Sequence, residues 1–222
     1  MAEILITGAT GFVGSHLVEA LARRGEGARA LVRRTSDVSL LARYGIEPVV
    51  GDIDDFDSLR TALGDADTVL HLAAATRALD DDTFFRVNAR GTRRLVDAMV
   101  ADGGGRRLVY LSSLAAVGPS GGRPVRPDDE PRPLTAYGRS KLEGEREVRD
   151  RTGLEGVVLR PPAVYGPRDR DLLTFFRLAR RGVLPTVGPP GREVQLIHAA
   201  DLASALLAAA RARGVCGTYH VA

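Results

Sequence analysis

Residues 4–18 read I-L-I-T-G-A-T-G-F-V-G-S-H-L-V, and the fold prediction starts from this stretch. A short apolar strand over residues 2–7 leads into glycines at positions 8, 11 and 14, and a helical pattern follows over residues 15–24. In such a turn Gly8 permits the tight bend, Gly11 lets a pyrophosphate approach the backbone, and Gly14 lets the helix pack on the sheet. The free N–H groups of Phe12 and Val13 would face the phosphates at the positive end of the helix. The alternative is a tight strand-to-helix turn that binds nothing.

The same alternation of strand and helix continues to residue 160. Further strands are expected over residues 28–32, 46–50, 68–72, 107–111 and 156–159, and helices over residues 35–44, 55–63, 81–101 and 135–151. Apolar strands without clean alternation, each separated by a helix, are typical of parallel strands covered on both faces. We therefore predict an α/β fold with a doubly wound parallel sheet, in which residues 1–160 form a dinucleotide-binding domain that also carries the catalytic residues.

After residue 160 the pattern changes to short pieces. A helix is expected over residues 171–182, a strand over 185–188, a helix over 200–213 and a strand over 218–221. We expect residues 161–222 to form a small, partial substrate-binding lobe that is shortened at its C-terminal end. The Pro- and Gly-rich segment 118–134 is predicted to be a long loop that acts as a lid or a pocket wall.

Composition excludes several classes of protein. The chain has 222 residues, 44% of them hydrophobic and 27% charged, with a formal net charge of +3, which is typical of a globular domain without a basic tail. Binding to nucleic acid is therefore not indicated. No apolar run is long enough to cross a bilayer and no signal peptide is recognisable, so we expect a cytoplasmic protein without a membrane partner. The single cysteine, Cys216, excludes an intramolecular disulfide and a cysteine-based zinc cluster, and we expect it to be buried.

A second cofactor signal follows the second strand. Arg33 lies 19 residues beyond Gly14 and is followed by Arg34. A carboxylate at this point would bind the ribose hydroxyls of NAD, whereas a guanidinium pairs with the 2′-phosphate of NADP. The sequence therefore favours NADP, with NAD as the alternative. The competing interpretation is that both arginines are merely solvated.

A tyrosine and a lysine lie one helical turn apart. Tyr137 and Lys141 share one face of the helix expected over residues 135–151, and Ser112 and Ser113 follow the strand 107–111 at the carboxyl edge of the sheet. Lys141 is the only lysine in the chain, against 30 arginines. A nearby ammonium would stabilise the phenolate of the tyrosine and lower its pKa. The alternative is an exposed helix lysine beside a half-buried tyrosine.

Together with the segments that surround them, these residues resemble the extended short-chain dehydrogenase/reductases, also called the NAD-dependent epimerase/dehydratase family. The resemblance covers nearly the whole chain and is carried by T-G-A-T-G-F-V-G (7–14), G-D-I (51–53), H-L-A-A (71–74), V-N-A-R-G-T (87–92), Y-L-S-S-L-A-A-V-G (110–118), Y-G-R-S-K (137–141) and L-R-P-P-A-V-Y-G-P (159–167).

The resemblance implies a role for each matching residue. In the family's pattern, Asp52 and Ile53 hold the adenine, Leu72, Ala73 and Ala74 line the adenosine ribose, Asn88 supports the central site, and Pro161 to Val164 flank the nicotinamide. Ser113 would polarise the substrate carbonyl, Tyr137 would exchange the proton, and Lys141 would tune it and hold the nicotinamide ribose. The resemblance also implies a homodimer formed by the helices 81–101 and 135–151.

Two departures from the sugar-nucleotide members guide the choice of substrate. Ala163 stands where those members commonly carry Asn, and Val194 stands where they carry Arg. The run V-R-R-T-S after the second strand is more similar to the dihydroflavonol reductases and hydroxysteroid dehydrogenases. The leading hypothesis is thus an NADP-preferring reductase that acts on an apolar carbonyl or alcohol. The alternatives are an NAD-dependent nucleotide-sugar epimerase or dehydratase and a non-catalytic NADP-sensing binding protein.

Overall fold

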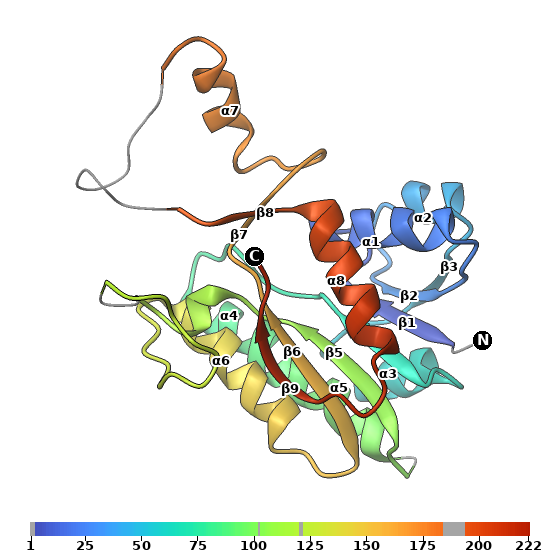
Figure 1. Ribbon diagram of the computed structural model, residues 1–222. Helices are drawn as coiled ribbons and strands as arrows, with labels where there is room; N and C mark the ends of the chain where they lie inside the picture. The colour runs from blue at the N-terminus through green and yellow to red at the C-terminus, as the bar shows by residue number, and fades with distance from the viewer. Residues whose placement is uncertain (1–2, 102, 120–121, 184–193) are drawn as a thin grey trace.

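Seven parallel strands form the central sheet of the protein, seen in a computed structural model that describes residues 3–101, 103–119, 122–183 and 194–222 (Figure 1). Their order is β3-β2-β1-β4-β5-β6-β9. The strands are β1 (Ile4–Thr7), β2 (Arg29–Val32), β3 (Glu47–Val50), β4 (Thr68–His71), β5 (Arg106–Leu111), β6 (Leu154–Arg160) and β9 (Gly217–His220). Because the order reverses between β1 and β4, a crevice opens at the carboxyl ends of these two strands. The predicted doubly wound α/β fold is confirmed.

Helices cover both faces of the sheet, which explains why the strands are apolar throughout. On one face α1 (Phe12–Arg23), α2 (Ser39–Arg43) and α8 (Ala199–Arg211) pack on a core that includes Ile4 and Ile6. On the other face α3 (Phe56–Leu63), α5 (Gly91–Ala101) and α6 (Ala136–Arg149) pack on a core that includes Leu5. Successive residues of β1 thus enter different cores, as the pleat of a strand requires.

The predicted helix over residues 81–101 is present, but it is not a uniform α-helix. It consists of α4 (Asp81–Phe85), a π-helical segment η1 (Arg86–Arg90) and α5. Wide π turns of this kind are rare and are found mostly at functional sites. Here the wide turn holds Asn88, which is fully buried.

The C-terminal quarter requires a correction to the predicted division of the chain. β7 (Ala163–Tyr165) pairs with β8 (Leu196–His198) in a separate two-stranded sheet, and neither strand was expected. Figure 1 shows α7 (Leu173–Ala179) standing away from the main sheet. However, α8 packs against α1, and β9 pairs with β6 in the main sheet. Helix α8 and strand β9 therefore belong to the main sheet and its core and not to a separate lobe. The predicted strand 185–188 lies outside the described residues.

Two further expectations concern composition. Within the described ranges, every helix is too short or too polar to cross a lipid bilayer. The expectation for Cys216 is wrong, because its side chain is exposed rather than buried. Cys216 lies in the short turn between α8 and β9.

Candidate active site

Two adjoining cavities lie along the carboxyl edge of the sheet. One, of about 450 Å³, runs over β2 and β3, and the other, of about 490 Å³, runs over β5 and β6. They share Gly8, Leu72 and Ala74, so together they form one groove across the point where the strand order reverses. A larger cavity of about 860 Å³ opens at the opposite edge of the sheet, but its wall contains none of the residues discussed below. The groove at the carboxyl edge is the candidate site, since ligands of open α/β sheets bind there.

The glycine turn forms the floor of this groove. Gly8 has a φ of +75°, and a Cβ at this position would come within 2.6 Å of the backbone nitrogen of Ala73. A Cβ on Gly14 would lie 2.2 Å from the carbonyl oxygen of Gly8. Neither position can accept a side chain, so the backbone stays bare where a ligand approaches. Phe12, Val13 and Gly14 line the second cavity, while Gly11, the exposed N-cap of α1, is not among its lining residues.

The first cavity contains the residues expected at the adenosine half of a dinucleotide. Its walls include Arg33, Asp52, Ile53, Leu72, Ala73 and Ala74. Ser36, which sequence reasoning did not select, lines the same cavity and accepts a hydrogen bond from the backbone N–H of Arg33 at 3.2 Å. The V-R-R-T-S run contained this serine, but its hydroxyl becomes a candidate ligand only once the turn is seen.

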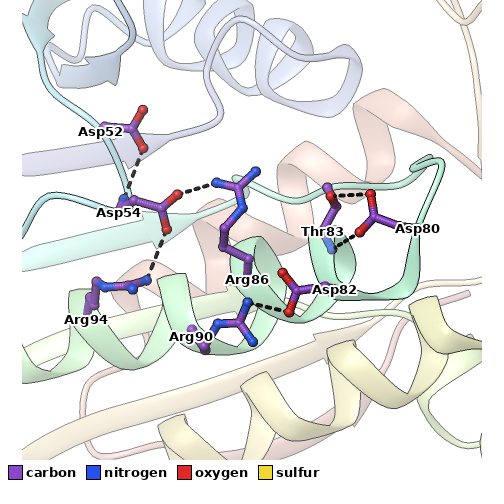
Figure 2. A network of polar contacts seen from close by, with 8 residues as sticks. All are labelled: Asp52, Asp54, Asp80, Asp82, Thr83, Arg86, Arg90 and Arg94. Atoms are coloured by element: carbon purple, nitrogen blue, oxygen red, sulfur yellow. Dashed lines mark hydrogen bonds and ion pairs between the residues drawn. The ribbon is translucent and has the colours of Figure 1, made fainter.

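Arg86 and Arg77 also line the first cavity, and both are already paired. Figure 2 shows Asp54 between Arg86 and Arg94, bound to both guanidinium groups, with the backbone N–H of Asp54 donating to Asp52 at 3.0 Å. Arg77 pairs with Asp171 at 2.6 Å. Within the described parts of the chain the Arg33 guanidinium has neither a hydrogen bond nor an ion pair. Arg33 is therefore the cation of this cavity that is available to an anionic ligand.

The second cavity brings together the three residues predicted to perform chemistry. Ser113, Tyr137 and Lys141 line it, together with Pro161 and Val164. Ser113 lies two residues after the end of β5 and caps a short 3₁₀ turn, η2 (Leu114–Ala116), by accepting a hydrogen bond from the backbone N–H of Ala115 at 3.1 Å. The hydroxyl of Ser113 lies close enough to that of Tyr137 to influence its pKa. The described residues of the loop 118–134 line neither half of the groove, which corrects the expectation of a pocket wall there.

Lys141 is completely buried, which is unusual for a lysine. Its Nζ donates to the carbonyl oxygen of Leu111 at 2.6 Å and lies 4.2 Å from the centre of the Tyr110 ring. Burial lowers the pKa of Lys141 to about 7, and the carboxylate of Glu145 opposes this effect. The pKa of Lys141 therefore lies near neutral pH, so a small change in its surroundings alters its charge.

The pKa of Tyr137 differs from the sequence expectation. Burial raises the pKa of Tyr137, and the nearby hydroxyl of Ser113 opposes the rise. The sequence predicts the opposite shift, a pKa of Tyr137 that is lowered by Lys141. Because desolvation dominates here, Tyr137 holds its proton near neutral pH, as a proton donor must.

Asn88 lies behind the groove and does not line it. Its side-chain oxygen accepts from the backbone N–H of Ala75 at 2.8 Å, and its nitrogen donates to the Ala75 carbonyl at 2.9 Å and to Ser140 at 3.0 Å. Asn88 thus connects the segment after β4 to the helix that carries Tyr137 and Lys141. Its expected role in cofactor binding is indirect, through the position of these two elements.

His71 is a buried structural residue, as its position at the end of β4 suggests. Its ring nitrogens lie 2.6 Å from Thr7 Oγ1 and 3.0 Å from Thr92 Oγ1. Burial lowers the pKa of His71 to about 3, so the ring is neutral at physiological pH. It contributes a neutral wall beneath Lys141 and does not add a charge.

Comparison with known proteins places this groove in a family. The sequence model of the NAD dependent epimerase/dehydratase family matches residues 4–222. The chain belongs to this family. A similar family member is the ceramide reductase of Caulobacter vibrioides, which is 38% identical over 209 residues covering 94% of this chain and 61% of the relative. The 3-beta-hydroxysteroid dehydrogenase of Mycolicibacterium neoaurum is 32% identical over 200 residues covering 83% of this chain and 52% of the relative.

A solved family member has the same architecture. MoeE5 in complex with UDP-glucose and NAD superposes with a TM-score of 0.81 at 32% identity, over 99% of this chain and 75% of MoeE5. The chain spans about 55–61% of the length of the first curated relatives that it matches. The chain therefore belongs to this family and has the same fold as a member that was solved with NAD.

Proposed function

We propose that this protein is an NADP-preferring oxidoreductase that moves a hydride between C4 of the nicotinamide and an apolar carbonyl or alcohol, with Tyr137 as the acid/base. The observation that carries the proposal is the second cavity, where the glycine turn and the Ser113, Tyr137 and Lys141 side chains share one wall. A hydride acceptor and a proton donor must flank the same substrate atom, and this cavity offers both positions.

The residues present fit a dinucleotide. The two positions at which a Cβ would collide with backbone, Gly8 and Gly14, lie where a pyrophosphate needs a bare backbone, and α1 begins beside them. Phe12 and Val13 would hold the pyrophosphate, Asp52 and Ile53 the adenine, and Lys141, Pro161 and Val164 the nicotinamide ribose and ring. When bound, the cofactor supplies or accepts the hydride.

The remaining steps belong to side chains of the chain itself. In the reductive direction, Ser113 donates a hydrogen bond to the substrate oxygen and stabilises the negative charge that develops on it. Tyr137, which is protonated because burial raises its pKa, delivers the proton to that oxygen. The positive charge of Lys141 then stabilises the phenolate that remains until solvent returns the proton.

The preference for NADP is supported by the charges around the first cavity. Arg77 and Arg86 are neutralised by aspartates, whereas Arg33 is unpaired among the described residues and lies beside the Ser36 hydroxyl. A guanidinium and a hydroxyl at the end of β2 match the oxygens of a 2′-phosphate. NAD is the alternative, and the NAD-bound structure of MoeE5 supports it.

An apolar substrate is supported by one part of the wall of the second cavity and by the relatives. Pro161, Pro162, Ala163 and Val164 form this apolar part, whereas the charged residues 168–171 line another part of the same cavity. The names of the ceramide reductase and the 3-beta-hydroxysteroid dehydrogenase both denote apolar compounds. The second candidate function is a nucleotide-sugar epimerase or dehydratase, because MoeE5 binds UDP-glucose with NAD.

The test is the oxidation of NADPH and NADH by the purified chain with a panel of apolar ketones and aldehydes, and separately with UDP-glucose. We expect turnover of at least one apolar carbonyl, faster with NADPH. Tyr137→Phe should abolish this turnover and leave cofactor binding intact. Tyr165→Phe is the matched control, since Tyr165 packs on Phe176 and His198 and does not line the cavity. Equal turnover by Tyr137→Phe and the native chain would refute the role of Tyr137.

We also propose a homodimer in which α5 and α6 pair with their counterparts in a second chain. These helices lie side by side on one face of the sheet, so their outer surfaces are available together. Light scattering at micromolar concentration should give about twice the 23.7 kDa of one chain. A mass of one chain over this concentration range would exclude the dimer.

A further inference from the structure

A buried ion pair lies directly behind the candidate active site, and the mechanism above does not use it. Glu145 is on α6, one turn after Lys141 and two turns after Tyr137, and it is fully buried. Both of its carboxylate oxygens are bound by Arg160, with Nε at 2.9 Å and Nη2 at 2.6 Å. Arg160 is only 1% exposed. The bidentate geometry fixes the orientation of the carboxylate as well as its distance.

The pair connects four parts of the protein. Ser112, which directly follows β5 and precedes Ser113, donates a hydrogen bond from its hydroxyl to Glu145. Arg160 is the last residue of β6, and its Nη1 donates to the carbonyl oxygen of Pro127 in the loop 118–134 at 3.3 Å. Glu145 therefore joins the helix that carries Tyr137 and Lys141 to the strand end that carries Ser113.

Stability does not explain this arrangement. Removing two charges from water is expensive, and replacing a buried ion pair with apolar residues of similar volume is often neutral or stabilising. The bidentate contact holds the Glu145 carboxylate in one orientation, and Lys141 is the site residue nearest to it along α6, one turn away.

The surroundings of Lys141 show what the pair supplies. The other ionisable groups that face its ammonium are neutral near pH 7: Tyr137 on α6, Tyr110 on β5 and His71 on β4. The nearby charges on α4, η1 and α5 are paired at the surface, as Asp81–Arg139, Asp82–Arg90 and Asp97–Arg151. The positive charge of Arg160 is balanced by Glu145 in their ion pair. Among the described residues, Glu145 is thus the carboxylate that acts on the ammonium, and it raises the pKa of Lys141 against the effect of burial.

We propose that Glu145, clamped by Arg160 and Ser112, is a positioning residue of the active site that keeps the Lys141 ammonium charged and fixes α6 against the strand end that carries Ser113. The proposal rests on the proposed function for its catalytic meaning, since it assigns Glu145 to the support of Lys141. The carboxylate itself does not line the groove and does not touch the substrate.

The single lysine makes a direct test possible. Chain produced with lysine labelled by ¹³C at Cε gives one side-chain signal, whose chemical shift reports the protonation of Lys141. In Glu145→Gln the midpoint of this titration should fall by about one pH unit, because the neighbouring negative charge has gone. Glu143→Gln is the matched control, since Glu143 is an exposed carboxylate on the same helix and should leave the midpoint unchanged.

A second variant keeps the test decisive if Glu145→Gln fails to fold. The double variant Glu145→Gln with Arg160→Met leaves no unpaired charge in the core, and its lysine midpoint should also lie below that of the native chain. Equal midpoints in the native chain and in either folded variant would overturn the proposal and leave the pair a purely structural role. In the turnover assay, the alkaline limb of kcat should move to lower pH by the same amount, with KM unchanged.

The two proposals can fail separately. The lysine titration needs neither cofactor nor substrate, so its dependence on Glu145 can be measured even if no carbonyl is reduced. Turnover that requires Tyr137, together with a lysine midpoint that ignores Glu145, would retain the proposed function and reject the positioning role.

Discussion

Replacing Lys141 with methionine should flatten the pH dependence of folding stability. The pKa of Lys141 is lowered from its ordinary value of 10.5 to about 7 in the folded protein. This difference of about 3.5 pH units corresponds to about 5 kcal/mol between the protonation states. The penalty applies in full below pH 7, where the folded state must hold a buried, charged lysine.

The sign follows from proton binding. Between about pH 7 and 10.5 the unfolded chain keeps the lysine proton and the folded protein releases it. Stability rises with pH wherever the unfolded state binds more protons, so Lys141 should raise the free energy of unfolding by about 1.4 kcal/mol per pH unit in this window. Because the folded-state lysine is already half deprotonated at pH 7, the native chain should have gained about 2 kcal/mol at pH 9 relative to pH 7, and Lys141→Met should lack this gain.

Urea unfolding at pH 7, 8 and 9 measures the effect at constant ionic strength. Arg146→Met removes an exposed cation from the same helix and should retain the native slope. Parallel stability curves for the native chain and Lys141→Met would show that Lys141 titrates normally and would refute the reasoning.

Three further substitutions test individual parts of the site. Gly138→Ala places a Cβ 2.3 Å from the carbonyl oxygen of Ala115, so it should displace the turn that Ser113 caps and lower kcat about 100-fold, while calorimetry finds unchanged cofactor affinity. Arg33→Asp should weaken NADP binding about 10- to 100-fold and leave NAD binding equal or tighter; an unchanged ratio of the two dissociation constants would reject Arg33 as the 2′-phosphate ligand. Asn88→Ala leaves both backbone groups of Ala75 without their partner and should lower the free energy of unfolding by about 1–3 kcal/mol in a denaturant titration. Asn88→Asp keeps only the accepting oxygen and should recover only part of this stability.

The local features of this protein could be predicted from its sequence. The glycines of the first turn, the apolar strands and the Tyr137–Lys141 spacing each depend on residues that are close in the chain. Local geometry was therefore enough to predict the turn between β1 and α1 and the shared face of α6 that carries Tyr137 and Lys141.

The features that sequence reasoning missed depend on contacts between distant segments. Glu145 is on α6 and Arg160 is the last residue of β6. Their spacing in the sequence does not indicate that the two side chains meet in the fold. β7 and β8 are three residues long and pair across more than thirty residues, which gives no periodic signal. The raised pKa of Tyr137 arises from burial under the complete fold and cannot be obtained from a lysine four residues away.

The measurement that tests the central claim most directly is calorimetric titration of the chain with NADP⁺ and with NAD⁺, followed by thermal unfolding at saturation. We predict tighter binding of NADP⁺ and, at about 100 times its dissociation constant, about 2.7 kcal/mol of added stability, or a rise of roughly 5–10 °C in Tm. Tyr137→Phe should bind both cofactors like the native chain. Binding of neither cofactor would contradict the assignment of the groove, and tighter binding of NAD⁺ would contradict the role given to Arg33.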